Sequence, residues 1–414
     1  MTIRSRFSND AVISSRQLET NIMSDLSSEY TKILAFRRFK RAVIDYFVRF
    51  IEERLRQRKK QLRQANQRQR QQHGTHRFIE AIFTKWWFYT ALHDGIDAFL
   101  PKDTLYVQTS DIAYHLRSYQ IKPVADDIAY DTEAIQRLCD QYRTESAIVP
   151  GSQIRVTLHQ GELQIMTDDK GDKGDSDEAS GDNKIVGGPG KVLETLTISS
   201  TQETHLRRRF RGPDDRLNDY ITVELLRLTA LGSISEHLSM PPILLDRLRI
   251  DVECFGTPLN TSLDNFCSPF PDIEREFGSR GNFMNFQFES GKRYTFNPPY
   301  DPDLMTTTTQ RMLTMLRDVP NVHVFVLFPV WDPETQRRMG LKDYGEPFPA
   351  FELIKESGFV HEAVAVKKDE FPYYNYFTDR YVTAANTHIL LLSNTDTLPE
   401  NWTMTQIERD WPRL

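Results

Sequence analysis

The sequence has few cysteines and no long apolar run, and both absences narrow the class of protein. Three cysteines (Cys139, Cys254 and Cys267) occur in 414 residues, and none belongs to a Cys-x-x-Cys pair. We therefore expect neither a disulfide framework nor a metal site, and a reducing compartment is the default. No run of about 18 apolar residues is present, so no membrane-spanning helix is predicted. The first 16 residues lack the apolar stretch of a secretory signal.

Strong positive charge is also missing. The formal net charge is -6, so any contact with nucleic acid must come from local basic patches rather than from the charge of the whole chain. Hydrophobic residues make up 39% and charged residues 27%, which is typical of a globular protein with a sizeable core. The length of 414 residues suits two or three domains.

The first half of the chain has helical patterns and two features with more than one interpretation. Apolar residues recur every three or four positions over about 28–72, which predicts a helix. Residues 54–70 hold eight Lys or Arg and no acid, typical of a solvated arm, an RNA-backbone contact or an import signal. A second helix is predicted over 76–100. Its Trp86-Trp87 pair indicates either a buried helix face or a platform for a base or cap.

The middle of the chain is mixed. A short β pair is predicted at 153–158 and 162–166, a strand at 193–200, and helices near 131–143 and over 203–250. Residues 168–191 are rich in Asp, Gly, Lys and Ser, which predicts a disordered loop. This loop lacks the ligand spacing of a calcium-binding EF-hand. Basic candidates for RNA contact are Arg37, Arg38, Lys40, Arg41, Arg77, Arg207, Arg208, Arg209 and Arg211.

From residue 248 onward the pattern changes to an α/β one. Apolar runs of strand length at 250–255, 322–328 and 387–392 alternate with helical stretches. We therefore predict an α/β catalytic domain preceded by a helix-rich domain. The predicted ranges are a flexible tail at 1–27, an accessory or RNA-binding domain at 28–240 and the catalytic domain at 241–414.

A first candidate binding edge follows the predicted strand at 250–255, where the chain turns into small residues and a proline. In open α/β sheets, ligands bind beyond the carboxyl ends of the strands, because loops and helix N-termini converge there. We predict cofactor contacts from Glu253, Phe255, Gly256, Pro258 and Asn260.

A second candidate segment, 268–281, combines acids, prolines and a Gly-Ser-Arg-Gly turn. Asp272, Glu274 or Glu276 could accept hydrogen bonds from the ribose hydroxyls of a cofactor. Gly278 and Ser279, with neighbouring backbone amides, could hold its amino-acid tail. An ordinary surface turn is the alternative interpretation.

The third segment, Asn297-Pro298-Pro299-Tyr300, has the motif of methyltransferases that act on exocyclic amines. An adenine amine is a poor nucleophile because its lone pair is delocalised into the ring. The Asn297 side chain and the Pro298 carbonyl can accept its two hydrogens, which draws the nitrogen towards tetrahedral geometry. The prolines fix the carbonyl direction beforehand, and Tyr300 can stack on the base. A plain turn or a WW-domain ligand are the alternatives.

With these motifs in order, residues from about 240 to 395 resemble the catalytic domain of the phosphorylated-CTD-interacting-factor family. That family comprises cap-specific adenosine-N(6) methyltransferases. The resembling segments are Glu253-Cys-Phe-Gly-Thr-Pro-Leu-Asn260, Phe277-Gly-Ser-Arg-Gly281, Asn297-Pro-Pro-Tyr300 with Asp303-Leu-Met305, Val326-Leu-Phe-Pro-Val-Trp331, Pro349-Ala-Phe351 and Asn386-Thr-His388. Several matches in one order are more specific than any single motif.

The resemblance implies a Rossmann-like domain that uses S-adenosyl-L-methionine and acts on capped mRNA beginning with adenosine. It implies a catalytic role for Asn297 to Tyr300, a cofactor contact from Asn297 and substrate contacts from Tyr300 and Asp303. Trp331 and Asp332 match the substrate-facing loop, where Trp331 could stack on the cap, although a core tryptophan is the alternative. A nuclear location and contact with the transcription machinery follow for a cellular member, and the cytoplasm or virion for a viral one.

Two departures from the family pattern matter. The family has Phe where this chain has Tyr300, so the extra hydroxyl needs a hydrogen-bond partner. No tryptophan pair suited to a WW domain precedes Trp86. Two other functions remain open on the sequence alone: an adenine-N(6) methyltransferase for DNA or internal RNA sites, and an inactive protein that binds RNA or a transcription complex.

Overall fold

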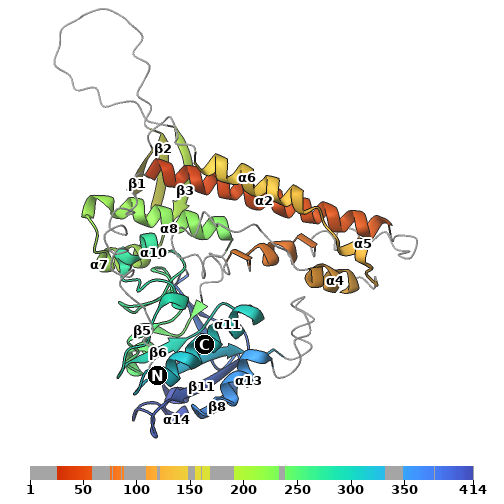
Figure 1. Ribbon diagram of the computed structural model, residues 1–414. Coiled ribbons are helices and arrows are strands. Elements are labelled where there is room, and N and C mark those ends of the chain that lie inside the picture. Colours follow the sequence, from red (N-terminus) through yellow and green to blue (C-terminus); the bar gives the residue numbers. More distant parts are fainter. Residues whose placement is uncertain are drawn as a thin grey trace, which may run out of the picture.

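The computed structural model places a helical part above an α/β part (Figure 1). Within the described ranges, no helix combines the length and apolar character needed to cross a bilayer. The described residues are 26–57, 75–76, 78–84, 86–87, 109–118, 122–147, 154–159, 161–167, 191–232, 238–331, 348–376 and 378–413.

The helical part is built on one long helix, α2, with α6 running beside it (Figure 1). The apolar residues of α2 recur every three or four positions, so they share the face that packs inward. Phe39 of α2 stacks on Tyr142 of α6 with ring centroids 4.8 Å apart. The helix predicted near 131–143 is thus confirmed as α6. Helices here include α2 (Leu26–Gln57), α4 (Thr109–Ser118), α5 (Ala125–Ile128) and α6 (Thr132–Ser146).

The Trp86-Trp87 pair belongs to the core of the helical part. Trp87 is fully buried and its ring lies 5.4 Å from that of Phe270, while Trp86 is 9% exposed and packs against Phe39 at 6.1 Å. The interpretation as a buried helix face is confirmed, and the base or cap platform is wrong.

A small antiparallel sheet closes one end of the helical part. Its strands are β1 (Ile154–His159), β2 (Glu162–Thr167) and β3 (Val192–Thr197), in the order β1-β2-β3. Arg37 of α2 donates two hydrogen bonds, of 2.8 and 2.9 Å, to Glu194 of β3, which fastens the sheet to the helix. The three strands predicted here are confirmed. Residues 1–25 of the tail predicted at 1–27 lie outside the described ranges, whereas Leu26 and Ser27 belong to α2 rather than to a tail. All but the last residue of the predicted loop at 168–191 also lie outside them.

The helical region predicted over 203–250 is divided into separate elements in the described residues. Its helical elements are α7 (Ser200–Arg209), the 3-10 turn η3 (Asp214–Arg216), α8 (Leu217–Leu231) and α9 (Pro242–Arg247). Pro213 separates α7 from η3, and Gly232 ends α8 at φ 80°. Helix α8 is buried on nearly every side, which makes it the central helix of this part.

The α/β part is organised around a mixed five-stranded sheet in the order β5-β6-β7-β11-β8. The first three strands are parallel, β11 is antiparallel to β7, and β8 is antiparallel to β11. The predicted α/β fold class is therefore confirmed. The strands are β5 (Val252–Glu253), β6 (Arg293–Phe296), β7 (His323–Pro329), β8 (Val360–Val366) and β11 (Thr387–Ser393).

Helices cover both faces of this sheet, because successive residues of β7 point to opposite sides. Val324, Val326 and Phe328 join the core under α11 (Pro302–Asp318) and α13 (Pro349–Lys355). Phe325 and Leu327 join a separate core under α9 and α14 (Met404–Asp410). A strand buried on both faces is a continuous apolar run, which is why β7 and β11 were predicted from the sequence.

A second, smaller sheet lies beside the first. It contains β4 (Leu238–Ser239), β9 (Tyr373–Asn375) and β10 (Arg380–Val382), in the order β10-β9-β4. Ser239 pairs with Tyr374 in the antiparallel register of β4 and β9. A segment that precedes β5 is thus joined to a segment that lies between β8 and β11 in sequence.

The helical and α/β parts share a core across the predicted boundary near residue 240. Leu259, Phe266, Phe270, Ile273 and Phe277 follow β5 in sequence, yet they belong to the core cluster of the helical part. Most of them lie near α10 (Pro271–Glu274) and η5 (Arg275–Phe277). The predicted domain ranges stay a prediction, and this shared core ties the loops after β5 to α8.

Candidate active site

The carboxyl ends of β5 and β6 lie side by side, and two of the predicted segments meet there. Glu253 pairs with Thr295 in parallel register, and the Cys254 amide donates a 2.9 Å hydrogen bond to the Thr295 carbonyl. The rings of Phe255 and Phe296, which come next on each strand, are 5.3 Å apart. This edge is where an open α/β sheet places a ligand.

Asn297 follows β6 directly and has the feature expected of a catalytic acceptor. Its side-chain oxygen Oδ1 is buried and, within the described part of the chain, has no hydrogen-bond partner. Buried acceptors are satisfied in most proteins, so an orphaned one at a strand end indicates a ligand group.

The Pro-Pro-Tyr segment after Asn297 is held rigidly. The Asp301 amide donates a 2.7 Å hydrogen bond to the Pro299 carbonyl. The Asp301 side chain then caps α11 by accepting from the Leu304 amide at 2.9 Å, and Pro302 occupies the first turn. Pro298 is buried. The start of a long helix thus fixes the direction of the loop.

The Tyr300 hydroxyl has a hydrogen-bond partner, as expected for a buried hydroxyl at this position. It lies 2.8 Å from the Tyr373 hydroxyl, which lies 2.9 Å from Thr387 Oγ1. Burial raises the pKa of both tyrosines, so both hydroxyls stay protonated and can donate. The Tyr300 ring meets Trp331 edge-on at 6.5 Å.

Gly256 and Asn260 shape the loop that leaves β5. A Cβ on Gly256 would lie 3.3 Å from Phe266 Cβ, so glycine permits the close approach of these segments. The Asn260 side chain accepts a 2.6 Å hydrogen bond from the Thr257 amide and thereby closes the turn around buried Pro258. Both predicted cofactor residues are thus placed at the edge, and Asn260 also has a structural partner.

The segment around Gly278 and Ser279 joins the same edge. Phe266 forms β-bridges with Glu253 on one side and Ser279 on the other. Gly278 has φ 109°, and a Cβ there would lie 2.3 Å from the Asp264 carbonyl oxygen. The Ser279 hydroxyl is 2.5 Å from that of Ser268. The turn beside β5 therefore requires glycine at position 278.

Glu253 and Asp272 are placed differently from a simple ribose contact. Glu253 is 2% exposed, and burial raises the pKa of its carboxyl to about 7, opposed by hydrogen bonds from Thr261 and Ser239 and by Arg209. Asp272 points to the helical part, where it accepts a 2.8 Å hydrogen bond from Arg227. Cofactor contact by either residue stays a prediction, and both have a structural partner.

The predicted substrate residues are only partly described. Trp331 is 4% exposed and packs 5.1 Å from Phe348, which favours the core interpretation for this side chain. Asp303 is half-buried in the first turn of α11. Asp332 lies outside the described residues.

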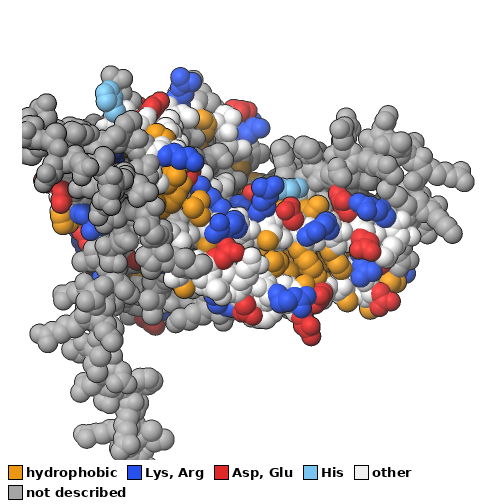
Figure 2. All heavy atoms as spheres, turned by 90° about the horizontal axis from the view of Figure 1, so that it is seen from above, with side chains coloured by type: hydrophobic (Ala, Val, Ile, Leu, Met, Phe, Trp, Pro, Cys, Tyr) orange, Lys and Arg blue, Asp and Glu red, His pale blue; other side chains and the backbone are white. Residues whose placement is uncertain are grey.

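The basic residues predicted for RNA contact are mostly paired within the protein. Arg38 pairs with Glu145, Lys40 with Glu80 and Arg207 with Glu203. Arg209 is buried and donates to the Thr261 carbonyl at 2.9 Å. On the face seen in Figure 2, the described Lys and Arg side chains are interleaved with Asp and Glu. Arg77 and residues 58–70 lie outside the described part.

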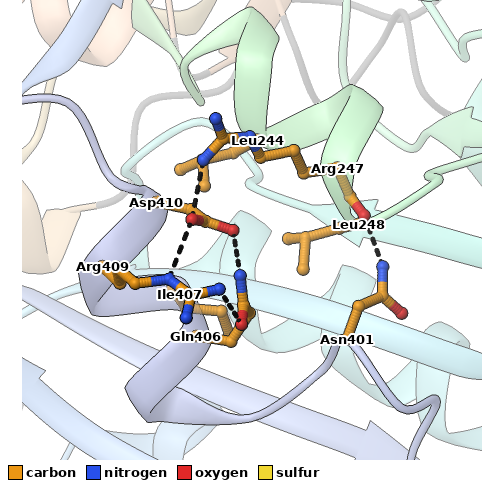
Figure 3. A pocket seen from close by; sticks show the side chains of 8 residues that line it. All are labelled: Leu244, Arg247, Leu248, Asn401, Gln406, Ile407, Arg409 and Asp410. Carbon is orange, nitrogen blue, oxygen red and sulfur yellow. Dashed lines mark hydrogen bonds and ion pairs between the residues drawn. The ribbon is translucent and has the colours of Figure 1, made fainter.

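A cavity of about 370 Å³ lies away from this edge, between α9 and α14 (Figure 3). Arg247 and Asp410 form an ion pair of 2.7 Å beside it. Arg293, at the amino end of β6, donates to the Leu248 carbonyl at 3.1 Å and reaches Asn401 at 3.4 Å. The cavity therefore lies near the amino end of β6, opposite the end that carries Asn297.

The sequence did not predict the contacts of three residues. Tyr373 contacts Tyr300, Thr387 contacts Tyr373, and Ser239 contacts Glu253. Tyr373 is 73 residues from Tyr300, and Ser239 is 14 residues from Glu253. Neither contact could be predicted from a periodic sequence pattern, because the pairing of β4 with β9 brings these distant segments together. The aromatic run Tyr373-Tyr374-Asn375-Tyr376 was the one visible hint.

Comparison with known proteins points to the same region. Residues 233–375 match the family model described as "Phosphorylated CTD interacting factor 1 WW domain". The chain is 32% identical over 152 residues to a human protein named mRNA (2'-O-methyladenosine-N(6)-)-methyltransferase, and equally to a mouse protein of that name. The aligned part is 35% of this chain and 20% of each relative, so the chain spans about a fifth of their length.

The matched residues include the parallel strands β5 to β7 and the Asn297–Tyr300 loop. The resemblance found in the sequence is confirmed: residues 233–375 are related to the phosphorylated-CTD-interacting-factor family.

Proposed function

We propose that this chain is an S-adenosyl-L-methionine-dependent methyltransferase that acts on the N(6) amine of the cap-adjacent adenosine in capped mRNA. The observation that carries the proposal is the buried Oδ1 of Asn297 at the carboxyl end of β6, beside the end of β5, for which no described residue provides a hydrogen-bond donor. The printed names of the human and mouse relatives support the choice of reaction and substrate.

The strand order supports a Rossmann-like domain. Strands β5, β6 and β7 are parallel, and the antiparallel strand β11 lies between β7 and β8. The carboxyl ends of β5 and β6 therefore lie together at one edge of the sheet. Helices on both faces of the sheet agree with a doubly wound arrangement.

In this mechanism Asn297 Oδ1 and the Pro298 carbonyl oxygen each accept a hydrogen bond from one N–H of the adenine amine. That removes the lone pair from the ring system and makes the nitrogen nucleophilic. Tyr300 holds the base by stacking, and the capped helix α11 keeps the loop in place before the substrate binds. Positioning therefore provides most of the rate acceleration.

The residues around the edge fit S-adenosyl-L-methionine. Gly256 and Gly278 let the segments after β5 pack closely against Phe266 and Asp264, and Asn297 follows β6 directly beside the end of β5, with its buried Oδ1 unpartnered among the described residues. When bound, the cofactor supplies an electrophilic methyl group. Mutating Gly256 or Gly278 would fill the space next to Phe266 or Asp264 and should weaken binding.

The proposed partners follow from the same function. The substrate is capped mRNA that begins with adenosine, with the transcription machinery as a further partner and the nucleus as the proposed location, or the cytoplasm or virion for a viral member. The match to the family model is consistent with these partners.

The test is methyl transfer from labelled S-adenosyl-L-methionine to two RNAs of one sequence, capped and uncapped, by the wild type, Asn297→Ala and the exposed control Asn285→Ala. We expect transfer to the capped RNA by the wild type and the control, and a loss of at least about 100-fold in Asn297→Ala. Equal transfer to both RNAs would favour the DNA or internal-RNA alternative. No transfer and no cofactor binding would favour the inactive protein.

A further inference from the structure

The small sheet β4-β9-β10 touches both halves of the proposed site. β4 precedes β5 in sequence, whereas β9 and β10 come after β8, so strand pairing alone brings them together. Tyr373 on β9 is 2% exposed and Ser239 on β4 is 1% exposed. Side chains alternate along a strand, so Tyr373 points inward while its neighbour Tyr374 is partly exposed.

On the catalytic side, Tyr373 bonds to Tyr300. Its hydroxyl lies 2.8 Å from that of Tyr300 and 2.9 Å from Thr387 Oγ1 on β11. Thr387 also donates to the Ala385 carbonyl at 3.0 Å. The chain of hydroxyls therefore fixes the position of the Tyr300 hydroxyl end of the ring from both the small sheet and the large one.

On the cofactor side, Ser239 bonds to Glu253. Its hydroxyl donates a 2.8 Å hydrogen bond to Glu253 Oε1, at the end of β5. Both hydrogen bonds therefore start from residues of the small sheet. One reaches Tyr300, after the end of β6, and the other reaches Glu253, at the end of β5.

We propose that β4-β9-β10 is a brace for the active site, in which Tyr373 positions Tyr300 and Ser239 positions Glu253. The proposal rests on the proposed methyltransferase function. A stacking ring whose position can shift holds a base in several orientations, and only some of them point the amine at Asn297. Locking the ring before substrate binds increases the productive fraction, which raises kcat rather than cofactor affinity.

The two halves of the brace predict different kinetic effects. Loss of the Tyr373 hydroxyl leaves the cofactor edge intact, so kcat should fall while affinity for S-adenosyl-L-methionine is kept. Loss of the Ser239 hydroxyl loosens the end of β5, so cofactor affinity should fall instead. A general loss of folding would change both quantities together.

The first experiment is a double-mutant cycle with Tyr300→Phe, Tyr373→Phe and the double variant, and Tyr381→Phe on β10 as the control. We expect kcat to fall about three- to tenfold in each single variant, as for one lost hydrogen bond, and no further in the double variant. Thermal unfolding of the same set should show the same non-additivity. Wild-type kcat in Tyr373→Phe, or additive losses, would overturn the proposal.

The second experiment measures S-adenosyl-L-methionine binding by calorimetry to Ser239→Ala and to Ser357→Ala, a control at the end of α13. We expect the Kd of Ser239→Ala to rise about three- to tenfold and that of the control to stay unchanged. Equal Kd values in both would overturn the Ser239 half of the brace. A wild type that binds the cofactor yet methylates no adenosine would overturn the proposed function, and the calorimetric and unfolding results would then show whether the brace exists without it.

Discussion

Asn297 has a buried oxygen, Oδ1, for which the described residues provide no hydrogen-bond donor. A buried acceptor without a partner destabilises a fold by about 1–3 kcal/mol, so such atoms are uncommon away from ligand sites. Here Oδ1 is buried directly after β6. In the proposed reaction, an amine hydrogen of the substrate supplies the donor for this oxygen.

Gly278 gives a sharp test of the loop geometry at the level of one residue. Its φ of 109° and the 2.3 Å approach to the Asp264 carbonyl exclude any side chain. Gly278→Ala should therefore lower the free energy of unfolding by more than 2 kcal/mol, roughly, because backbone must move as well as adopt strain.

The control for that substitution is Gly358→Ala. Gly358 also has positive φ, 77°, but a Cβ there meets nothing within 4 Å. Its loss should be limited to roughly 1 kcal/mol. Chemical denaturation of both variants measures the two values, and equal losses would show that the contact with Asp264 is not tight.

Glu253 makes stability depend on pH. Burial raises its carboxyl pKa to about 7, above the ordinary 4.5, so the folded protein holds this proton more tightly than the unfolded chain. The stabilisation is complete below about pH 4.5 and is lost as pH rises to about 7. Glu253→Gln should flatten the fall of melting temperature in this window. The difference from the wild type isolates Glu253, and an unchanged pH slope would contradict the assigned pKa.

At the scale of elements, Arg227 joins three helices. From α8 it lies 2.8 Å from Glu29 of α2 and 2.7 Å from Asp272 of α10, and its guanidinium lies 5.3 Å from the centre of the Phe270 ring. Its side chain is 1% exposed. The junction therefore holds the loop after β5 against the helical part.

Arg227→Met should destabilise the protein by about 3–5 kcal/mol, because two carboxylates lose their buried counter-charge. The matched control is Arg38→Met, since Arg38 pairs with Glu145 at the surface with 63% of its side chain exposed. That change should be worth at most about 1 kcal/mol. Urea unfolding measures the loss of unfolding free energy in both variants. Similar losses would mean that the buried Arg227 ion pairs contribute no more to stability than the surface pair of Arg38.

Elements with a complete local signal could be predicted from the sequence. β7 and β11 are buried on both faces, so they are continuous apolar runs, and α6 has a capping Asp131 and a 3–4 spacing. β6 is only four residues long and β8 alternates buried and exposed positions at the edge of the sheet. Short and edge strands are stabilised by their neighbours, so their own sequences predict little.

The site could be predicted where its residues are contiguous. Asn297 to Tyr300 share one loop, so their chemistry was visible in the sequence. The fixed position of Tyr300 was not, because it depends on Tyr373 and Thr387 from two other strands. The ion pair of Asp272 was not predicted for the same reason, since its partner Arg227 comes from a helix 45 residues earlier.

At the scale of the whole molecule, the helical part supports the catalytic edge from behind. Residues that follow β5 are buried in the core of the helical part, and Arg209 of α7 donates to the carbonyl of Thr261 in the same loop. In a chain of net charge -6 with several paired basic residues, the proposed binding of RNA depends on local basic patches rather than on overall charge. The chain spans about a fifth of its relatives' length, and the family model covers the residues of the edge.

The most direct test of the central claim is to locate the transferred methyl group. Two capped RNAs that differ only in their first nucleotide, adenosine or guanosine, are incubated with the protein and labelled S-adenosyl-L-methionine, digested to nucleosides and analysed by mass spectrometry. We predict N(6)-methyladenosine from the cap-adjacent position of the first RNA and no label in the second. Label at internal adenosines of both RNAs would contradict cap-adjacent specificity, and label on no adenosine would contradict the proposed role of Asn297.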